Sequence, residues 1–303
     1  MLLDTKLPIR YIFKDIYPDL GWVLLMSGVF QLLKHFFASY LPVLPLQLAT
    51  VLGGGISLLL AFNISQSYDR WWEARKVWGA IINDSRSLVL QAQGFIAGEE
   101  LPTPGPAAAL QALAYRQIAW CYSLGQALRG LDASAGLASY LAEAEQMYLQ
   151  THTNKPLALL ALHTNQLKTL YWQGALNAFQ HVQLDATLVR LCDALGRAER
   201  IRNTVFPTSY RLLIHFFIYL FLGTLSLSLV ETVGDWEVPL LLTIATTYFL
   251  LERTARYLQD PFSNRPTDTP VTALARTVEI NLKQLLGEAQ VPVPLPAESY
   301  YLR

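Results

Sequence analysis

The sequence predicts an all-α membrane protein, and three observations favour this class. Charged residues make up 15% of the 303 residues, whereas a soluble domain typically carries about 25%. Hydrophobic residues make up 52% and gather in four long apolar runs, and patterns typical of β-strands are nearly absent. Four buried helices of a soluble protein are the alternative, but so few charged residues could not cover them. The same composition argues against a disordered chain or a nucleic-acid-binding protein.

The first two apolar runs lie near the N-terminus. Residues 35–68 contain no Asp, Glu, Lys or Arg, and prolines within 42–45 interrupt the stretch. We therefore predict one membrane helix at about 21–40 and a second at about 46–64. Each is close to the roughly 20 residues that a helix needs to cross hydrocarbon.

Two further apolar runs lie near the C-terminus. Residues 212–230 read LLIHFFIYLFLGTLSLSLV and are long enough to form a third membrane helix. The last run, 238–251, has only 14 residues between two glutamates. Trp236, Tyr248 and Tyr257 are expected to extend this fourth helix as interfacial anchors.

Lys34 falls inside the first predicted helix, and the basic residues that flank the four helices all lie on one side. They are Arg10, Lys14, Arg70, Arg75, Lys76, Arg197, Arg200, Arg202, Arg211, Arg253 and Arg256. The two short connections, around 42–45 and 231–237, contain none. Because basic loops remain in the cytoplasm, we expect a multi-pass protein with both termini and the long middle segment inside. We see no removable signal peptide.

The middle segment is rich in Ala, Leu and Gln and predicts a helical cytoplasmic domain. Turn signals at 102–106, 130–136 and 153–156 separate its helices. Helical patterning continues from the second membrane helix through 67–90, so one long helix is expected to leave the membrane. The chain thus divides into an N-terminal cytoplasmic or interfacial segment (1–20), two membrane helices (21–64), the helical cytoplasmic domain (65–204), two more membrane helices (205–257) and a C-terminal cytoplasmic segment (258–303).

The stretch FNISQSYDRWWEARKVWG at 62–79 follows the second membrane helix and carries three tryptophans. Trp71, Trp72 and Trp78 suit the headgroup zone of a bilayer. Arg75 lies one helical turn from Trp71, where a cation can meet an indole face. Taken alone, this pattern indicates an interfacial anchor.

The same stretch resembles the bestrophin family, in its bacterial branch. Three motifs carry the resemblance in the family's order: SYDRWWEARKVWG at 67–79, GRAERI at 196–201 and QDPF at 259–262. The first motif is fairly specific, whereas the other two alone would be weak. The residues of interest in the first and last motifs are Ser67, Tyr68, Asp69, Arg70, Trp71, Trp72, Glu73, Arg75, Trp78, Asp260, Pro261 and Phe262.

The resemblance implies a homopentameric ion channel of the bacterial inner membrane. Each subunit would contribute four membrane helices and a large helical cytoplasmic domain around one axial pore. Its partners would be the lipid bilayer, copies of itself and small monovalent ions. The family is chiefly associated with anions such as chloride, but cation selectivity stays open for a bacterial member. A non-conducting scaffold or sensor, whose cytoplasmic helices bind a partner, is the alternative.

By the same resemblance, Gly54, Leu58 and Phe62 form the neck of the pore. Their spacing of four places them on one helix face, and rings of apolar side chains would form a constriction that can lose its water. Gly54 stands where a large aliphatic residue is expected, so the outer neck should be wider or more flexible. Close packing between helices is the other explanation for the glycines at 53–55.

The family's second constriction, the cytosolic aperture, matches Phe179. A core position in a cytoplasmic helix is the alternative for this residue. His181 lies close by in the sequence and could adjust conductance with pH. A solvated surface histidine is the simpler explanation.

No metal, cofactor or catalytic site is predicted. The five histidines show no metal-ligand spacing, Cys121 and Cys192 form no CxxC motif, and no nucleophile or nucleotide-binding motif occurs. Animal bestrophins bind calcium after the DPF motif. Here Gln259 replaces an expected Glu and only Asp268 is acidic in the following stretch, so we expect no calcium site.

Overall fold

The computed structural model describes residues 13–37, 44–96, 105–297 and 300–302, and all their long elements are helices. In chain order they are α2 (Tyr17–Phe37), α3 (Leu46–Phe95), α4 (Pro106–Leu128), α5 (Glu143–Gln150), α6 (Lys155–Trp172), α7 (Ala178–Asn203), α8 (Thr208–Val233), the 3-10 helix η1 (Gly234–Trp236), α9 (Glu237–Gln259) and α10 (Val271–Leu285). The all-α fold class is therefore confirmed.

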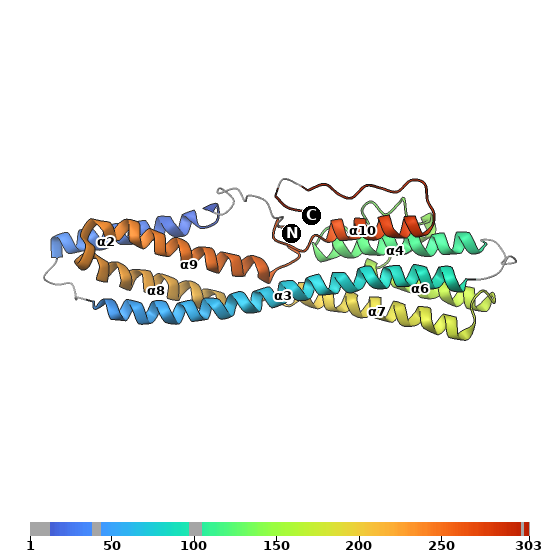
Figure 1. Cartoon of the computed structure of the whole chain (residues 1–303), viewed down its shortest axis with the longest axis horizontal. Helices are drawn as coiled ribbons and strands as arrows, with labels where there is room; N and C mark the ends of the chain where they lie inside the picture. Colours follow the sequence, from blue (N-terminus) through green and yellow to red (C-terminus); the bar gives the residue numbers. More distant parts are fainter. Residues whose placement is uncertain (1–12, 38–43, 97–104, 298–299, 303) are drawn as a thin grey trace. The chain divides into compact units, whose positions relative to one another are not determined.

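The helices form two compact units, which are described separately (Figure 1). The four-helix unit lies within 13–71 and 205–260, and the six-helix unit lies within 72–204 and 261–302. The helix α3 contributes to both units and is continuous over 50 residues. No proline interrupts it, so no hydrogen bond of its interior is lost for want of a backbone N–H. The prediction that the second membrane helix runs on past its apolar part is confirmed.

The four-helix unit consists of α2, the first part of α3, α8 and α9. Its core contains Leu60 of α3, Ile218 of α8 and Phe249 of α9, all at most 1% exposed. By length and composition, α2, α3 and the 208–229 part of α8 could each cross a membrane. The predicted fourth span lies in α9, which has 23 residues but is not among these three described helices. Acidic and basic residues occupy its two ends.

The six-helix unit consists of the second part of α3 with α4, α5, α6, α7 and α10 (Figure 1). The turn predicted at 130–136 is confirmed by glycines with positive φ at its two ends, 71° at Gly130 and 72° at Gly136. The turn predicted at 153–156 contains Asn154, the N-cap of α6, whose side chain accepts a hydrogen bond from the N–H of Leu157 at 3.1 Å. The turn predicted at 102–106 falls mostly outside the described residues.

Trp78 is a core residue of the six-helix unit, and its assignment to the headgroup zone is wrong. Its side chain is 0% exposed. A Cβ on Gly125 of α4 would lie 3.8 Å from the Trp78 ring and 3.3 Å from Val271 of α10. The missing side chain at Gly125 thus leaves room for the indole between α3, α4 and α10. This packing depends on residues far away in the sequence, which the local pattern could not reveal.

Candidate functional site

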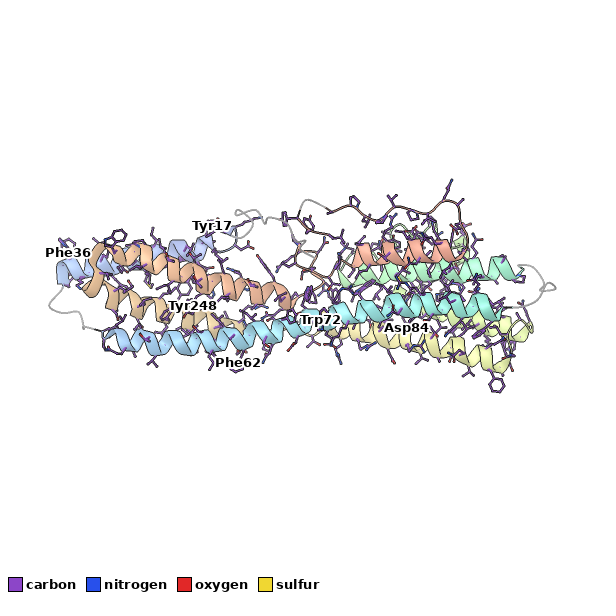
Figure 2. All side chains as sticks on the ribbon, viewed as in Figure 1. Tyr17, Phe36, Phe62, Trp72, Asp84 and Tyr248 are labelled. Carbon is purple, nitrogen blue, oxygen red and sulfur yellow. The ribbon has the colours of Figure 1, made fainter. Side chains whose placement is uncertain are left out.

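The helix α3 has two different faces in the four-helix unit. Gly54, Leu58 and Phe62 lie on the exposed face, with Leu58 60% and Phe62 56% exposed. The opposite face is buried and includes Ile56 and Leu60. Figure 2 shows Phe62 on the side of α3 that points away from α9. The predicted neck residues therefore form one apolar stripe that their own chain leaves uncovered.

The three consecutive glycines at 53–55 of α3 differ in their surroundings. A Cβ on Gly53 would lie 2.9 Å from the Phe221 ring and 3.5 Å from the Tyr248 hydroxyl. A Cβ on Gly54 or Gly55 would have nothing within 4 Å. Close helix packing thus explains Gly53 within the four-helix unit. It does not explain Gly54, which lies on the exposed stripe.

The first and third family motifs meet inside the four-helix unit. Gln259 at the end of α9 donates hydrogen bonds to Asn63 Oδ1 and Ser67 Oγ of α3, both at 3.2 Å. Arg211 of α8 donates to Gln259 Oε1 at 3.3 Å. Asn63, Ser67 and Gln259 are at most 4% exposed. Asn63 directly follows Phe62, so these bonds fix α3 at the Phe62 end of the stripe.

The first and second motifs meet inside the six-helix unit. Glu73 of α3 forms an ion pair with Arg200 of the GRAERI stretch on α7. Both side chains are partly exposed, so this pair is expected to contribute little to stability. Its geometric effect is to join α3 to the last turn of α7.

The remaining residues of the first motif lie near the surface of their units. Tyr68 is 49% and Trp72 44% exposed, and Asp69 is also exposed. Arg70, Trp71 and Arg75 are half-buried. The rings of Tyr68 and Trp71 lie 6.0 Å apart. Exposed aromatic rings of this kind suit contact with lipid headgroups or with another protein surface.

The DPF motif marks the point where the chain leaves the four-helix unit. Asp260 is the C-cap of α9, the carbonyl of Pro261 accepts from the N–H of Thr269 at 3.1 Å, and Phe262 is a core residue that is 2% exposed. Asp268 closes the same loop, since Oδ2 accepts from the N–H of Arg265 at 3.0 Å. Burial raises the pKa of Asp268 to about 6. The Asp268 carboxylate thus stabilises the loop in which it lies.

No group of three or more His, Cys, Asp or Glu side chains that could hold a metal occurs among the described residues. Of the two cysteines, Cys121 is buried and Cys192 is exposed. The Cys121 thiol is held protonated because burial raises its pKa to about 12.

Phe179 lies in the first turn of α7 and is 88% exposed. The alternative that it fills the core is therefore wrong. Asn177 and Gln180 fix this turn by a capping box, in which each side chain accepts from the other residue's N–H at 2.9 Å. The His181 ring lies 5.2 Å from the Tyr171 ring. The capped first turn of α7 thus presents a large apolar ring outside the core of the six-helix unit.

Sequence reasoning missed the buried charges of the four-helix unit. Asp19 of α2 is 7% exposed and pairs with Arg253 of α9 at 2.9 Å, while Tyr219 of α8 donates to it at 3.0 Å. In the sequence, the signal for this ion pair was an acidic residue, Asp19, before the first apolar run and a basic residue, Arg253, after the fourth. These bonds tie α2, α8 and α9 together, because a buried charge requires a partner.

A second buried acid, Glu237, starts α9 and is 0% exposed. It accepts hydrogen bonds from Ser27 at 2.8 and 2.9 Å and from Gln31 at 2.9 Å, both on α2, and another from Ser226 of α8. Neutral donors of this kind can satisfy a carboxylate inside a helix bundle. The sequence marked Glu237 only as the boundary of the fourth run.

Three helices apolar enough to span a bilayer, with apolar side chains facing outward from them, define an α-helical membrane protein. The chain belongs to the bestrophins of bacteria and fungi, because the model of this family, described as bacterial/fungal bestrophin protein, matches residues 9–284. The resemblance identified in the sequence is thereby confirmed.

Curated relatives and solved structures agree with this assignment. The chain is 29% identical over 287 residues to the voltage-dependent anion channel-forming protein mll4386 of Mesorhizobium japonicum, which covers 94% of this chain and 89% of the relative. It is 30% identical over 254 residues to the Escherichia coli protein YneE, which bears the same descriptive name, with coverages of 83% and 80%. A crystal structure of a bestrophin homologue from Klebsiella pneumoniae superposes with a TM-score of 0.84 at 27% identity, covering 91% of this chain and 100% of that one.

Proposed function

We propose that this protein is a homopentameric channel that lets small monovalent ions pass down their gradient across the bacterial inner membrane. In this proposal α2, α3, α8 and α9 are the four spans, and both termini and the six-helix unit lie in the cytoplasm. The uncovered stripe of Gly54, Leu58 and Phe62 carries the proposal. A spanning helix with an apolar face that its own subunit does not cover suits the lining of a neck shared by several copies.

The neck would act as a hydration barrier. Five Leu58 and five Phe62 side chains around an axis would offer water no hydrogen-bond partner, so the constriction would conduct only when it is wet. Gly54 would leave the outer end of the neck wide. Phe179 would form the second constriction at the start of α7. Apolar rings select neither sign of charge, and the names of the relatives favour anions.

Flux through liposomes tests the conducting function. Purified protein in liposomes should dissipate a salt gradient. Leu58→Ala and Phe62→Ala should each raise the ion flux, because smaller apolar rings admit water more easily. Leu25→Ala is the matched control. Leu25 is an apolar residue of α2 that is 55% exposed, and its replacement should leave the flux unchanged.

A non-conducting scaffold gives a different result in the same experiment. Wild-type protein would not dissipate the salt gradient, and the two neck variants would behave like Leu25→Ala. That outcome would contradict the channel. A selective effect of Leu58→Ala and Phe62→Ala would contradict the scaffold.

The native cysteines provide a test of the proposed topology. Cys192 on α7 is exposed, whereas Cys121 on α4 is buried. A membrane-impermeant maleimide should therefore label Cys192 in opened membranes and not in intact spheroplasts. Labelling of intact spheroplasts would place the six-helix unit on the outer side and contradict the proposal.

A further inference from the structure

Four residues from three helices form a compact contact behind the outer half of the stripe, and we call it the Gly53 contact. It consists of Gly53 and Ser57 of α3, Phe221 of α8 and Tyr248 of α9. The Tyr248 hydroxyl donates to the carbonyl of Gly53 at 3.1 Å and lies 2.8 Å from Ser57 Oγ. Ser57 Oγ donates to the same carbonyl at 2.8 Å. The Phe221 and Tyr248 rings lie 5.1 Å apart.

In the Gly53 contact, Gly53 faces away from Leu58, whereas Ser57 is exposed and lies beside the stripe. Successive residues of an α-helix are separated by about 100°, so Gly53 lies about 140° around the helix from Leu58. Gly53 is buried, whereas Gly54 and Leu58 are exposed. Figure 2 shows Tyr248 between the ribbons of α9 and α3, on the side opposite to Phe62. The hydrogen bond from Tyr248 to the Gly53 carbonyl therefore draws α3 toward α9 and away from the side on which Leu58 lies.

Three physical features make the Gly53 contact important for the position of α3. Within hydrocarbon, a tyrosine hydroxyl has no water to bond, so its bond to a backbone carbonyl is retained. The segment 53–55 has three consecutive glycines and is the weakest helical stretch of the predicted span. α3 also packs closely against α8 at Gly53, because a Cβ there would lie 2.9 Å from the Phe221 ring.

We propose that Tyr248 is a positioning residue that keeps the outer neck wide by tethering α3 to α9 through the carbonyl of Gly53. This inference rests on the proposed function, since it assumes that Gly54 and Leu58 face a shared pore. Loss of the tether would let the glycine segment move toward the pore axis. The Leu58 ring would then become narrower and lose water more often.

Two independent changes should narrow the neck in the same way. Tyr248→Phe removes only the hydroxyl and should lower the single-channel conductance by roughly threefold or more, because dewetting depends steeply on radius. Gly53→Ala adds a Cβ that pushes α3 away from Phe221, and it should also lower the conductance. Adding Phe221→Leu to Gly53→Ala makes room for the new methyl group and should restore the conductance.

The experiment records single channels of these variants in planar bilayers beside Tyr219→Phe. Tyr219 is the matched control, because its hydroxyl bonds to Asp19 on α2 and not to α3. Size-exclusion profiles check that each variant assembles like the wild type. In a Leu58→Ala background the effect of Tyr248→Phe should largely disappear, since the widened ring remains wet. A loss of fold stability alone would not produce that coupling.

The possible results separate the two proposals. If Leu58→Ala raises the conductance but Tyr248→Phe matches Tyr219→Phe, the tether is refuted and the neck stands. The tether is also refuted if Tyr248→Phe lowers the conductance equally in the Leu58→Ala background. If Leu58→Ala leaves the conductance unchanged, the neck itself is wrong and the tether falls with it.

Discussion

His163 on α6 is a fully buried imidazole in the six-helix unit. Neither ring nitrogen has a hydrogen-bond partner among the described residues. Burial, assisted by the nearby Arg116 guanidinium, holds the pKa of His163 well below its usual value. The ring is therefore neutral at physiological pH. An unpaired buried polar group typically costs about 1–3 kcal/mol, so this histidine weakens the unit that contains it.

Replacing His163 by leucine should stabilise the protein and change its pH dependence. At pH 7.5 the unfolding free energy should rise by about 1 kcal/mol, because the unpaired nitrogens are removed. Below the unfolded-state pKa of about 6.5, the unfolded wild-type chain binds a proton that the native state does not. Wild-type stability therefore falls as the pH is lowered through this value. Thermal unfolding in detergent at pH 7.5 and 5.0 should show a smaller loss for His163→Leu.

Asp268 contributes to the pH dependence with the opposite sign. Burial raises its pKa to about 6 from the ordinary 3.8, so the native state binds the proton first and gains stability as the pH falls through this value. Both proteins contain Asp268, and its effect cancels in their difference. A parallel loss of stability in wild type and His163→Leu would show that His163 is not the cause.

At the level of elements, α3 shows what the sequence could and could not predict. Helical patterning that continues past the uncharged run predicted one long helix, and the spacing of four placed Gly54, Leu58 and Phe62 on one face. The sequence could not show that Tyr248 would bond to Gly53, because α9 follows almost 200 residues later. Tyr248 was predicted as an interfacial anchor, yet its hydroxyl is bonded to α3.

The open space at Gly54 leads to a prediction about the outer neck. A Cβ there would have no other heavy atom of the described chain within 4 Å. Gly54→Leu should add a third large apolar ring and lower the single-channel conductance by roughly threefold or more. Gly28→Leu on α2 is the matched control, since a Cβ there also has nothing within 4 Å. Equal conductance in the two variants would show that Gly54 does not line the neck.

The bonds of Gln259 should stabilise the four-helix unit. Gln259→Leu leaves Asn63 Oδ1 without the amide donor that it has in the wild type, and Arg211 loses an acceptor. The unfolding free energy in detergent should fall by about 1–3 kcal/mol. Gln290→Leu is the control, because Gln290 is exposed outside the helices. A loss no greater than that of the control would show that the two motifs meet without stabilising each other.

For the whole molecule, the sequence predicted the order of helices and the division between apolar and charged segments. The balance of charge along the chain supplied an orientation, because basic residues avoid the two short connections. The sequence could not predict which side chains would be buried, because the helices that bury them are distant in the chain. Trp78, buried by α4 and α10, and Phe179, left exposed on α7, are the two clearest cases.

The choice between anions and cations would have to arise outside the neck, because Leu58 and Phe62 carry no charge. If five copies of Phe179 surround the cytosolic aperture, charges placed there should set the sign of the permeant ion. Phe179→Lys should shift the reversal potential in asymmetric salt toward that of the anion, and Phe179→Glu toward that of the cation, with several-fold changes in permeability ratio. Phe179 is 88% exposed, so neither change should disturb the fold.

Two comparisons make this experiment decisive for Phe179. Val189→Lys puts the same charge on α7 at a residue that is 53% exposed and lies ten residues further along the helix, about 15 Å away. It should shift the reversal potential much less. Leu58→Ala and Phe62→Ala should raise the conductance without moving the reversal potential, because they change the radius and add no charge. Equal shifts for Phe179→Lys and Val189→Lys would mean that Phe179 does not line the aperture, and selectivity would then have to come from another ring of residues.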